Sequence, residues 1–158
     1  MGVLFHSDGV GFSISNPEKL NAWVIKCLSS FNKNCGEINV IFCNDDYLLS
    51  INKTYLNHDY YTDIITFDYS KSEGVSGDLY ISITRVKDNA KKLKQEFNDE
   101  LYRVIVHGVL HLCGLKDKTK QEKEEMRAKE DEMLLLMSWL SVFYVVPRET
   151  FKCLKNTM

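Results

Sequence analysis

The chain has 158 residues, of which 44% are hydrophobic and 27% charged, as in an ordinary soluble globular protein. This length suits one domain that buries a core without needing disulfides. The formal net charge of -2 excludes a strong overall attraction to nucleic acid, so any RNA or DNA site has to be a local patch.

The cysteines and the apolar segments indicate where the protein works. Five cysteines without a CxxC pair favour reduced thiols and a cytoplasmic location over a disulfide framework. The first residues lack the basic and apolar segments of a signal peptide. The most apolar stretch, residues 133–146, is shorter than a membrane span and contains two serines, so we expect it to be packed or surface-docked and predict no membrane association.

The first half of the chain predicts two helices and an intervening strand. Asn16-Pro17 combines a cap with proline at the first helical position, which begins a helix. Residues 36–43 predict a strand, and Asn44 caps a second helix. The core-facing side chains of the two helices are, in order, Leu20, Trp23, Val24, Cys27, Leu28 and Phe31, then Leu48, Ile51 and Tyr55.

The second half predicts two short strands and then helices. The strands cover residues 62–69 and 77–83, with a turn between them. Thr84 begins a helix that Asn98-Asp99 ends. Its apolar stripe is Val86, Ala90, Leu93 and Phe97.

The most apolar helix is predicted at residues 100–113, where nearly every face is hydrophobic, so it should be the buried central one. Gly114 is placed to cap it. A charged helix should follow at about 120–137. Because helices and strands mix without strict alternation, and no linker or repeat occurs, we predict an α+β domain with one small sheet. We assign residues 1–140 to this domain and 141–158 to a tail of unknown role.

The sequence HGVLHLCGLKD, residues 107–117, has the spacing of a three-ligand metal site. His107 and His111 are four residues apart, so a helix places both imidazoles on one face. Gly114 lets the chain turn back, which brings Asp117 within reach of the same point. Three protein ligands leave one coordination position open, as catalytic zinc sites do. A hydrogen-bonded core histidine is the simpler alternative for either imidazole alone.

Two residues of the motif restrict its chemistry. Gly108 stands where a zinc protease carries the glutamate that acts as general base, which argues against a protease and predicts a packing role for the glycine. Asp117 is an acceptable third ligand, and we expect one Zn²⁺. Two histidines and one carboxylate also suit Fe²⁺ or another divalent ion, so the metal's identity stays open.

The motif resembles the hallmark of the YbeY family of bacterial zinc-dependent endoribonucleases, H-G-x-L-H-L-x-G-x-x-H. Every fixed position matches except the last, where Asp117 replaces histidine. Residues 52–69 and 76–82 resemble two further segments of that family, in the same order, and Glu124, Glu125 and Met126 fall at its spacing. The resemblance covers residues 36–137.

The resemblance implies a compact fold with a mixed sheet of about four strands and a metal site at the end of the central helix. It also implies a metal held by His107, His111 and Asp117, whose bound water would do the catalysis. The substrate would be single-stranded RNA. The role would be maturation of ribosomal RNA, including the 3′ end of 16S rRNA, and ribosome quality control. Partners would be the small ribosomal subunit or its assembly factors; the oligomeric state is not indicated.

Leu56 is a second departure, because the family usually has arginine there, a plausible phosphate clamp. Leucine cannot hydrogen-bond a phosphate. Lys53, Arg85, Arg103 or Lys118 could bind the phosphate in place of the missing arginine. His58 could be a catalytic group, or equally a solvated loop residue. Lysines at 87–94 and 116–123 could steer an RNA backbone or form ordinary solvated faces.

Two other functions remain compatible with these residues. One is a zinc metallopeptidase whose general base comes from elsewhere in the chain. The other is a ribosome-assembly factor that binds RNA without cutting it. The leucine at position 56, in place of the family's usual arginine, is consistent with this alternative.

Overall fold

The described residues, 2–144 of a computed structural model, form a four-stranded sheet packed with five helices. This confirms the predicted α+β fold and its small mixed sheet. The elements in chain order are β1 (Gly2–Ser7), α1 (Pro17–Ser30), β2 (Cys35–Cys43), α2 (Asp45–Leu56), β3 (Ile64–Asp68), β4 (Val75–Ser82), α3 (Ile83–Leu93), α4 (Phe97–Leu112) and α5 (Lys120–Tyr144).

The sheet has the strand order β1-β2-β4-β3. β1 and β2 are parallel, as are β2 and β4, whereas β3 runs antiparallel to β4 and forms one edge. Side chains alternate between the two faces. Leu79 and Ile81 of β4 therefore belong to the main core, and Tyr80 between them packs against a smaller cluster on the other face.

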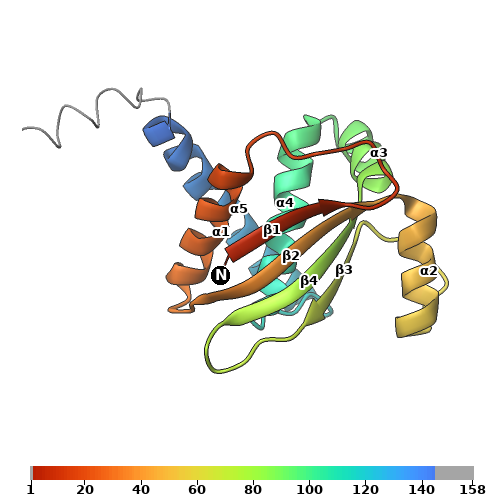
Figure 1. Ribbon diagram of the computed structural model, residues 1–158, viewed down its shortest axis with the longest axis horizontal. Helices are drawn as coiled ribbons and strands as arrows, with labels where there is room; N and C mark the ends of the chain where they lie inside the picture. Colours follow the sequence, from red (N-terminus) through yellow and green to blue (C-terminus); the bar gives the residue numbers. More distant parts are fainter. Residues whose placement is uncertain (1, 145–158) are drawn as a thin grey trace, which may run out of the picture.

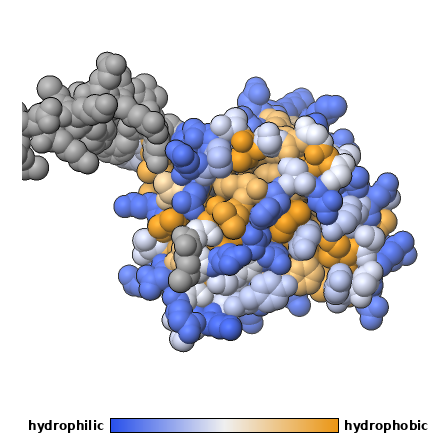
Figure 2. All heavy atoms as spheres, in the orientation of Figure 1, coloured by the Kyte–Doolittle hydropathy of each residue, from blue (hydrophilic) through white to orange (hydrophobic). Residues whose placement is uncertain are grey.

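The helices cover the two faces of the sheet unequally. Apolar side chains of α1, α3, α4 and α5 join the main core on one face, and in Figure 1 α4 and α5 lie behind the strands. On the other face, among the helices of residues 2–144, α2 alone contributes, through Leu48 and Ile51. Figure 2 shows the open face, where hydrophilic residues are interspersed with apolar ones. The thick layer of helices is therefore the one that can hold a buried site.

Helix α4 is the central buried helix, as predicted. A Cβ atom on Gly108 would lie 2.7 Å from Ile64 Cδ1 and 2.9 Å from Leu79 Cδ2, so glycine lets α4 approach the sheet closely. This is the packing role that the sequence predicted. Gly114, with φ of +99°, follows the last turn and allows the chain to reverse.

One strand was missed, and three expectations about the elements were wrong. Strand β1 was not anticipated. The helix break lies at Lys94, which adopts a left-handed conformation, whereas Asn98-Asp99 lies in the first turn of α4 and Phe97 begins that helix. Tyr55 is 70% exposed and Leu93 is 53% exposed, so neither faces the core.

The C-terminal helix α5 extends to Tyr144, past the predicted boundary at residue 140. The remainder of the predicted tail, 145–158, lies outside the described residues. Trp23 Nε1 of α1 donates a hydrogen bond of 2.8 Å to the carbonyl of Met133 in α5, which ties the start of the apolar stretch into the core. Across residues 2–144, no helix is long and apolar enough to cross a membrane.

Candidate metal centre

Three side chains converge at the carboxyl end of α4. His107 Nε2 lies 3.0 Å from His111 Nε2, and Asp117 Oδ2 lies 3.1 Å from the first nitrogen and 3.3 Å from the second. Among the described residues, these three form the group of histidine, cysteine and acidic side chains that could hold a metal ion. The predicted ligands are therefore brought together by the fold.

Hydrogen bonds at the far side of each ring leave both Nε2 atoms free to act as ligands. His111 Nδ1 lies 2.9 Å from the carbonyl oxygen of Leu115, and His107 Nδ1 lies 2.7 Å from Glu130 Oε2. Both oxygens only accept hydrogen bonds, so each Nδ1 carries the proton and donates. The two Nε2 lone pairs and the carboxylate oxygen then face one another, which is favourable only around a cation.

The donor set fits a divalent metal ion. A tetrahedral zinc with ligands at about 2.0–2.1 Å holds them about 3.3 Å apart, close to the separations found here. Two imidazoles and one carboxylate leave a fourth position open. Each of the three side chains is partly exposed, so ions and substrate can reach the site from solvent.

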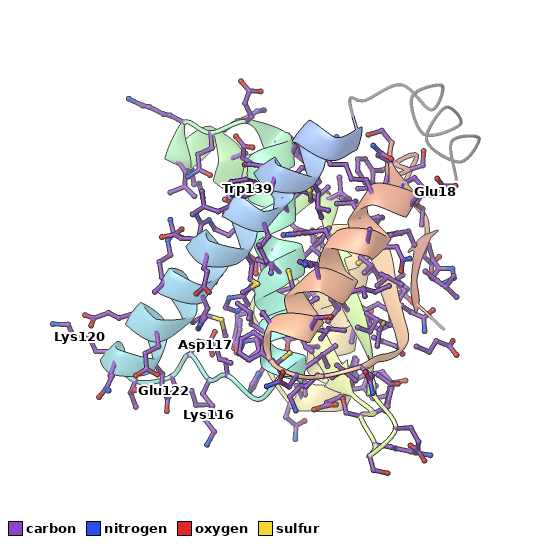
Figure 3. All side chains as sticks on the ribbon, turned by 90° about the vertical axis from the view of Figure 1, so that its left-hand side faces the viewer. Glu18, Lys116, Asp117, Lys120, Glu122 and Trp139 are labelled. Atoms are coloured by element: carbon purple, nitrogen blue, oxygen red, sulfur yellow. The ribbon has the colours of Figure 1, made fainter. Side chains whose placement is uncertain are left out.

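A capping box fixes the loop that carries Asp117. The Thr119 hydroxyl accepts a hydrogen bond from the Glu122 N–H, and Glu122 Oε2 accepts bonds from the N–H groups of Thr119 and Lys118. This reciprocal arrangement begins α5. In Figure 3 Asp117 points inward from this loop, whereas Lys116 beside it points to solvent.

Glu130 orients His107 and joins α4 to α5. Its carboxylate is 5% exposed and accepts from His107 and from Arg103 Nη1, at 2.9 Å, so both oxygens are engaged. Burial acts to raise the pKa of Glu130, but the hydrogen bonds from His107 and Arg103 outweigh it and hold this pKa below its ordinary value. Glu130 is therefore an anion that keeps the ring of His107 in its ligating orientation.

Two hollows meet at the candidate metal centre. The groove, of about 560 Å³, runs between the end of α2, strand β3 and the ligands. The cavity, of about 380 Å³, lies on the other side of His107, between α4 and α5. Both are lined by Asp63, Ile64, His107 and Asp117. A polymer lying across the centre can therefore extend to both sides of it.

Two of the five other predicted residues line the groove. His58 is there, with its ring stacked on Tyr60 at 5.1 Å and its Nδ1 3.0 Å from the Tyr60 hydroxyl. The buried Asn52 holds this loop through a hydrogen bond of 2.9 Å to the Tyr60 carbonyl. Lys118 also lines the groove, and its side chain is exposed.

The other predicted cations are engaged by carboxylates. Arg103 lines the cavity but donates to Glu130 and, at 2.7 Å, to Asp131. Lys53 pairs with Asp59 at 3.2 Å, and Arg85 pairs with Asp45 at 2.8 Å; neither lines the groove or the cavity.

Leu56, the last residue of α2, lines the groove and is 41% exposed. An arginine at this place would face the same hollow. With leucine here, Lys118 is the permanent cation among the groove's described lining residues, while Arg103, Lys123 and Arg127 line the cavity. The cavity therefore has more basic side chains than the groove, together with the carboxyl groups of Asp63, Glu100, Asp117 and Glu130.

Sequence reasoning gave no role to Asp63, Glu100, Arg127 or Glu130, all of which line the cavity. Burial raises the pKa of Asp63, partly offset by the nearby His107. Glu130 lies in a run of charged residues that looked like a solvated face. The spacing of buried Met126, Glu130, Met133 and Met137 on one side of α5 was the available signal.

The geometry defines a class of protein: an α+β domain with an open three-ligand metal site at the end of a buried helix. The family model described as "Endoribonuclease YbeY" matches residues 10–138. Proteins named "Endoribonuclease YbeY" are 46% identical over 85% of this chain and 89% of their own in Porphyromonas gingivalis, and 52% identical over 80% and 91% in Flavobacterium psychrophilum.

The fold agrees with a solved relative. The solution structure of a Thermotoga maritima protein is 26% identical, covers 88% of this chain and 92% of its own, and superimposes with a TM-score of 0.59. The chain belongs to the YbeY family.

Proposed function

We propose that this protein is a metal-dependent endoribonuclease that cuts single-stranded RNA in the maturation of ribosomal RNA. The convergence of three ligand atoms, each histidine held by its Nδ1, carries the proposal. Membership of a family of proteins named endoribonucleases supports it. The 3′ end of 16S rRNA is the expected substrate, with the small ribosomal subunit or its assembly factors as partners.

The metal would be held by His107 Nε2, His111 Nε2 and Asp117 Oδ2. We expect Zn²⁺, with Fe²⁺ as the alternative that the same donors allow. When bound, such an ion supplies Lewis acidity and a more acidic water at the open position. Glu130 and the Leu115 carbonyl keep the two imidazoles in place for it.

The chain's own residues would bind and orient the RNA. Lys118 reaches the groove from the loop beside Asp117, and His58 faces the same hollow, so either can contact a phosphate or a 2′-hydroxyl. Arg103 lines the cavity, but both ends of its guanidinium are held by carboxylates, so its role is to fix Glu130 in place. Lys53 and Arg85 are paired with Asp59 and Asp45 and line neither hollow, so we assign them no direct contact with the RNA.

A peptidase mechanism is disfavoured by Gly108. No space exists beside His107 for the glutamate of a zinc protease, because even a Cβ would lie within 3 Å of Ile64 and Leu79 side-chain atoms.

Cys27, Cys35, Cys43 and Cys113 are free thiols, which agrees with the reducing conditions of a cytoplasmic RNA-processing enzyme.

The test measures metal content and RNA cleavage in the same preparations. Wild type should hold one metal ion and cut an unstructured oligoribonucleotide faster than a hairpin. His107→Ala and Asp117→Ala should lose metal and cleavage together. His6→Ala is the matched control, because His6 lies on β1 and bonds Asn39, so metal and cleavage should both persist.

The outcomes separate the competing functions. Cleavage by metal-free His107→Ala at the wild-type rate would refute the proposal. RNA binding without turnover, with one metal ion present, would identify an assembly factor. Hydrolysis of a fluorogenic peptide that is lost in His107→Ala would identify a peptidase.

A further inference from the structure

The cavity between α4 and α5 contains a carboxylate that the proposed chemistry does not use. Glu100 of α4 lines the cavity and is 5% exposed. Its Oε2 atom is buried and has no hydrogen-bond partner among residues 2–144. A buried carboxylate oxygen without a donor is costly, so this atom is an acceptor available to a ligand that enters the cavity.

The other groups of the cavity disfavour a second metal ion. Glu130 has both oxygens engaged by Arg103 and His107, so it offers no free ligand atom. Among residues 2–144, the side chains placed close enough to hold an ion are those of His107, His111 and Asp117 alone, whereas Lys123 and Arg127 are exposed cations at the cavity. The free Glu100 oxygen can therefore accept a hydrogen bond from an uncharged N–H or O–H group of a ligand. The cations at the cavity can bind a negatively charged group of the same ligand.

A nucleotide combines these two properties. The Arg127 side chain is 56% exposed and lies 4.0 Å from Glu130, and Lys123 is exposed, so both can meet a backbone phosphate from solvent. Val104, Met126 and Ile64 supply apolar lining for the faces of a flat ring. The volume of about 380 Å³ accommodates one base.

The position of the cavity indicates which nucleotide of a bound RNA strand would enter it. Cavity and groove share His107 and Asp117, so a strand with its phosphodiester at these ligands has one neighbouring nucleotide on each side. Single-stranded RNA is commonly read by splaying a base into a pocket and hydrogen-bonding its edge.

We propose that the cavity is a base-recognition subsite in which Glu100 selects guanine in the nucleotide next to the cleaved bond. This inference rests on the proposed endoribonuclease function. Guanine carries an N–H and an amino group side by side on its Watson–Crick edge, which is the donor pattern that a carboxylate accepts best. Glu100 is a specificity residue in this scheme and takes no part in bond breaking.

The experiment compares cleavage of oligoribonucleotides that differ in one base on either side of the cut. Wild type should prefer guanosine on one side by roughly 10- to 100-fold in kcat/KM, the value of one hydrogen bond to a charged group. Glu100→Gln should abolish most of that preference while metal content and the cleavage of disfavoured substrates stay unchanged. Glu124→Gln, an exposed change of the same charge on α5, should keep the preference.

A second variant protects the test against misfolding. Glu100→Asp keeps the charge but withdraws the carboxylate by one methylene, so it should also weaken the preference. Equal cleavage of all bases by wild type, or an unchanged preference in both Glu100 variants, overturns the inference and leaves the nuclease proposal intact. A second bound metal ion that Glu100→Gln removes also overturns it. A metal-loaded wild type that cuts no RNA removes both proposals.

Discussion

Glu130→Gln tests the idea that a buried carboxylate on α5 holds a metal ligand of α4 in place. Glu130 is 5% exposed and lies 2.7 Å from His107 Nδ1 and 2.9 Å from Arg103 Nη1. Glutamine preserves the shape but has one oxygen to accept from both His107 and Arg103. Its amide N–H groups would face one of these two donors, and two donors cannot bond each other. Loss of such a partner weakens metal binding by about 10- to 100-fold, or about 1.4–2.7 kcal/mol.

The assay is a competition of Zn²⁺ between the protein and a chromophoric chelator. Asp131→Asn is the matched control, because Asp131 bonds the same Arg103 at 2.7 Å but does not contact a ligand, and its side chain is 59% exposed. The control should bind zinc within about twofold of wild type, as expected for an exposed pair. Unchanged affinity in Glu130→Gln, or an equal loss in Asp131→Asn, would refute the reasoning.

Four further predictions concern the core. Gly108→Ala should lower the free energy of unfolding by about 1 kcal/mol, because overpacking against the sheet exceeds the gain in helix propensity; equal or higher stability in urea would show that the space exists. Trp23→Phe should cost about 2 kcal/mol through the lost bond to Met133, and a loss under about 0.5 kcal/mol by the same assay would contradict the role of that bond. Burial raises the pKa of Cys27 and of Cys43 to about 12, so a thiol reagent at about pH 8 should label both only on unfolding; rapid labelling of the native protein would count against their burial. Because these folded-state pKa values exceed the unfolded ones, stability should also fall as the pH rises from 9 toward 12.

The elements with a strong local period were predictable from the sequence. The apolar stripe of α1 repeats at helical spacing, and its members Leu20, Trp23 and Val24 are fully buried. The ligand triangle was also predictable, because the four-residue spacing and the turn at Gly114 are local geometry.

Other features depend on contacts between distant residues. β1 is a strand because it pairs with β2, and its exposed Leu4 and buried Val3 form too short a pattern to reveal this. Lys94 ends α3 in a left-handed conformation without the glycine that usually marks such a turn. The partner of His107 is 23 residues away, on a helix whose other charges are solvated.

The orientation of α4 affects how the centre meets an RNA backbone. His107 and His111 occupy the last two turns of this 16-residue helix, where the aligned peptide dipoles leave about half a negative charge. That end attracts a cation and repels a phosphate. The amino end of α5 follows Asp117, but Glu122 accepts hydrogen bonds from the Lys118 and Thr119 N–H groups, so these amides are not free to bind a phosphate as helix amino ends do in many enzymes. RNA affinity should therefore depend on the bound ion and on flexible lysines, and should fall steeply with added salt.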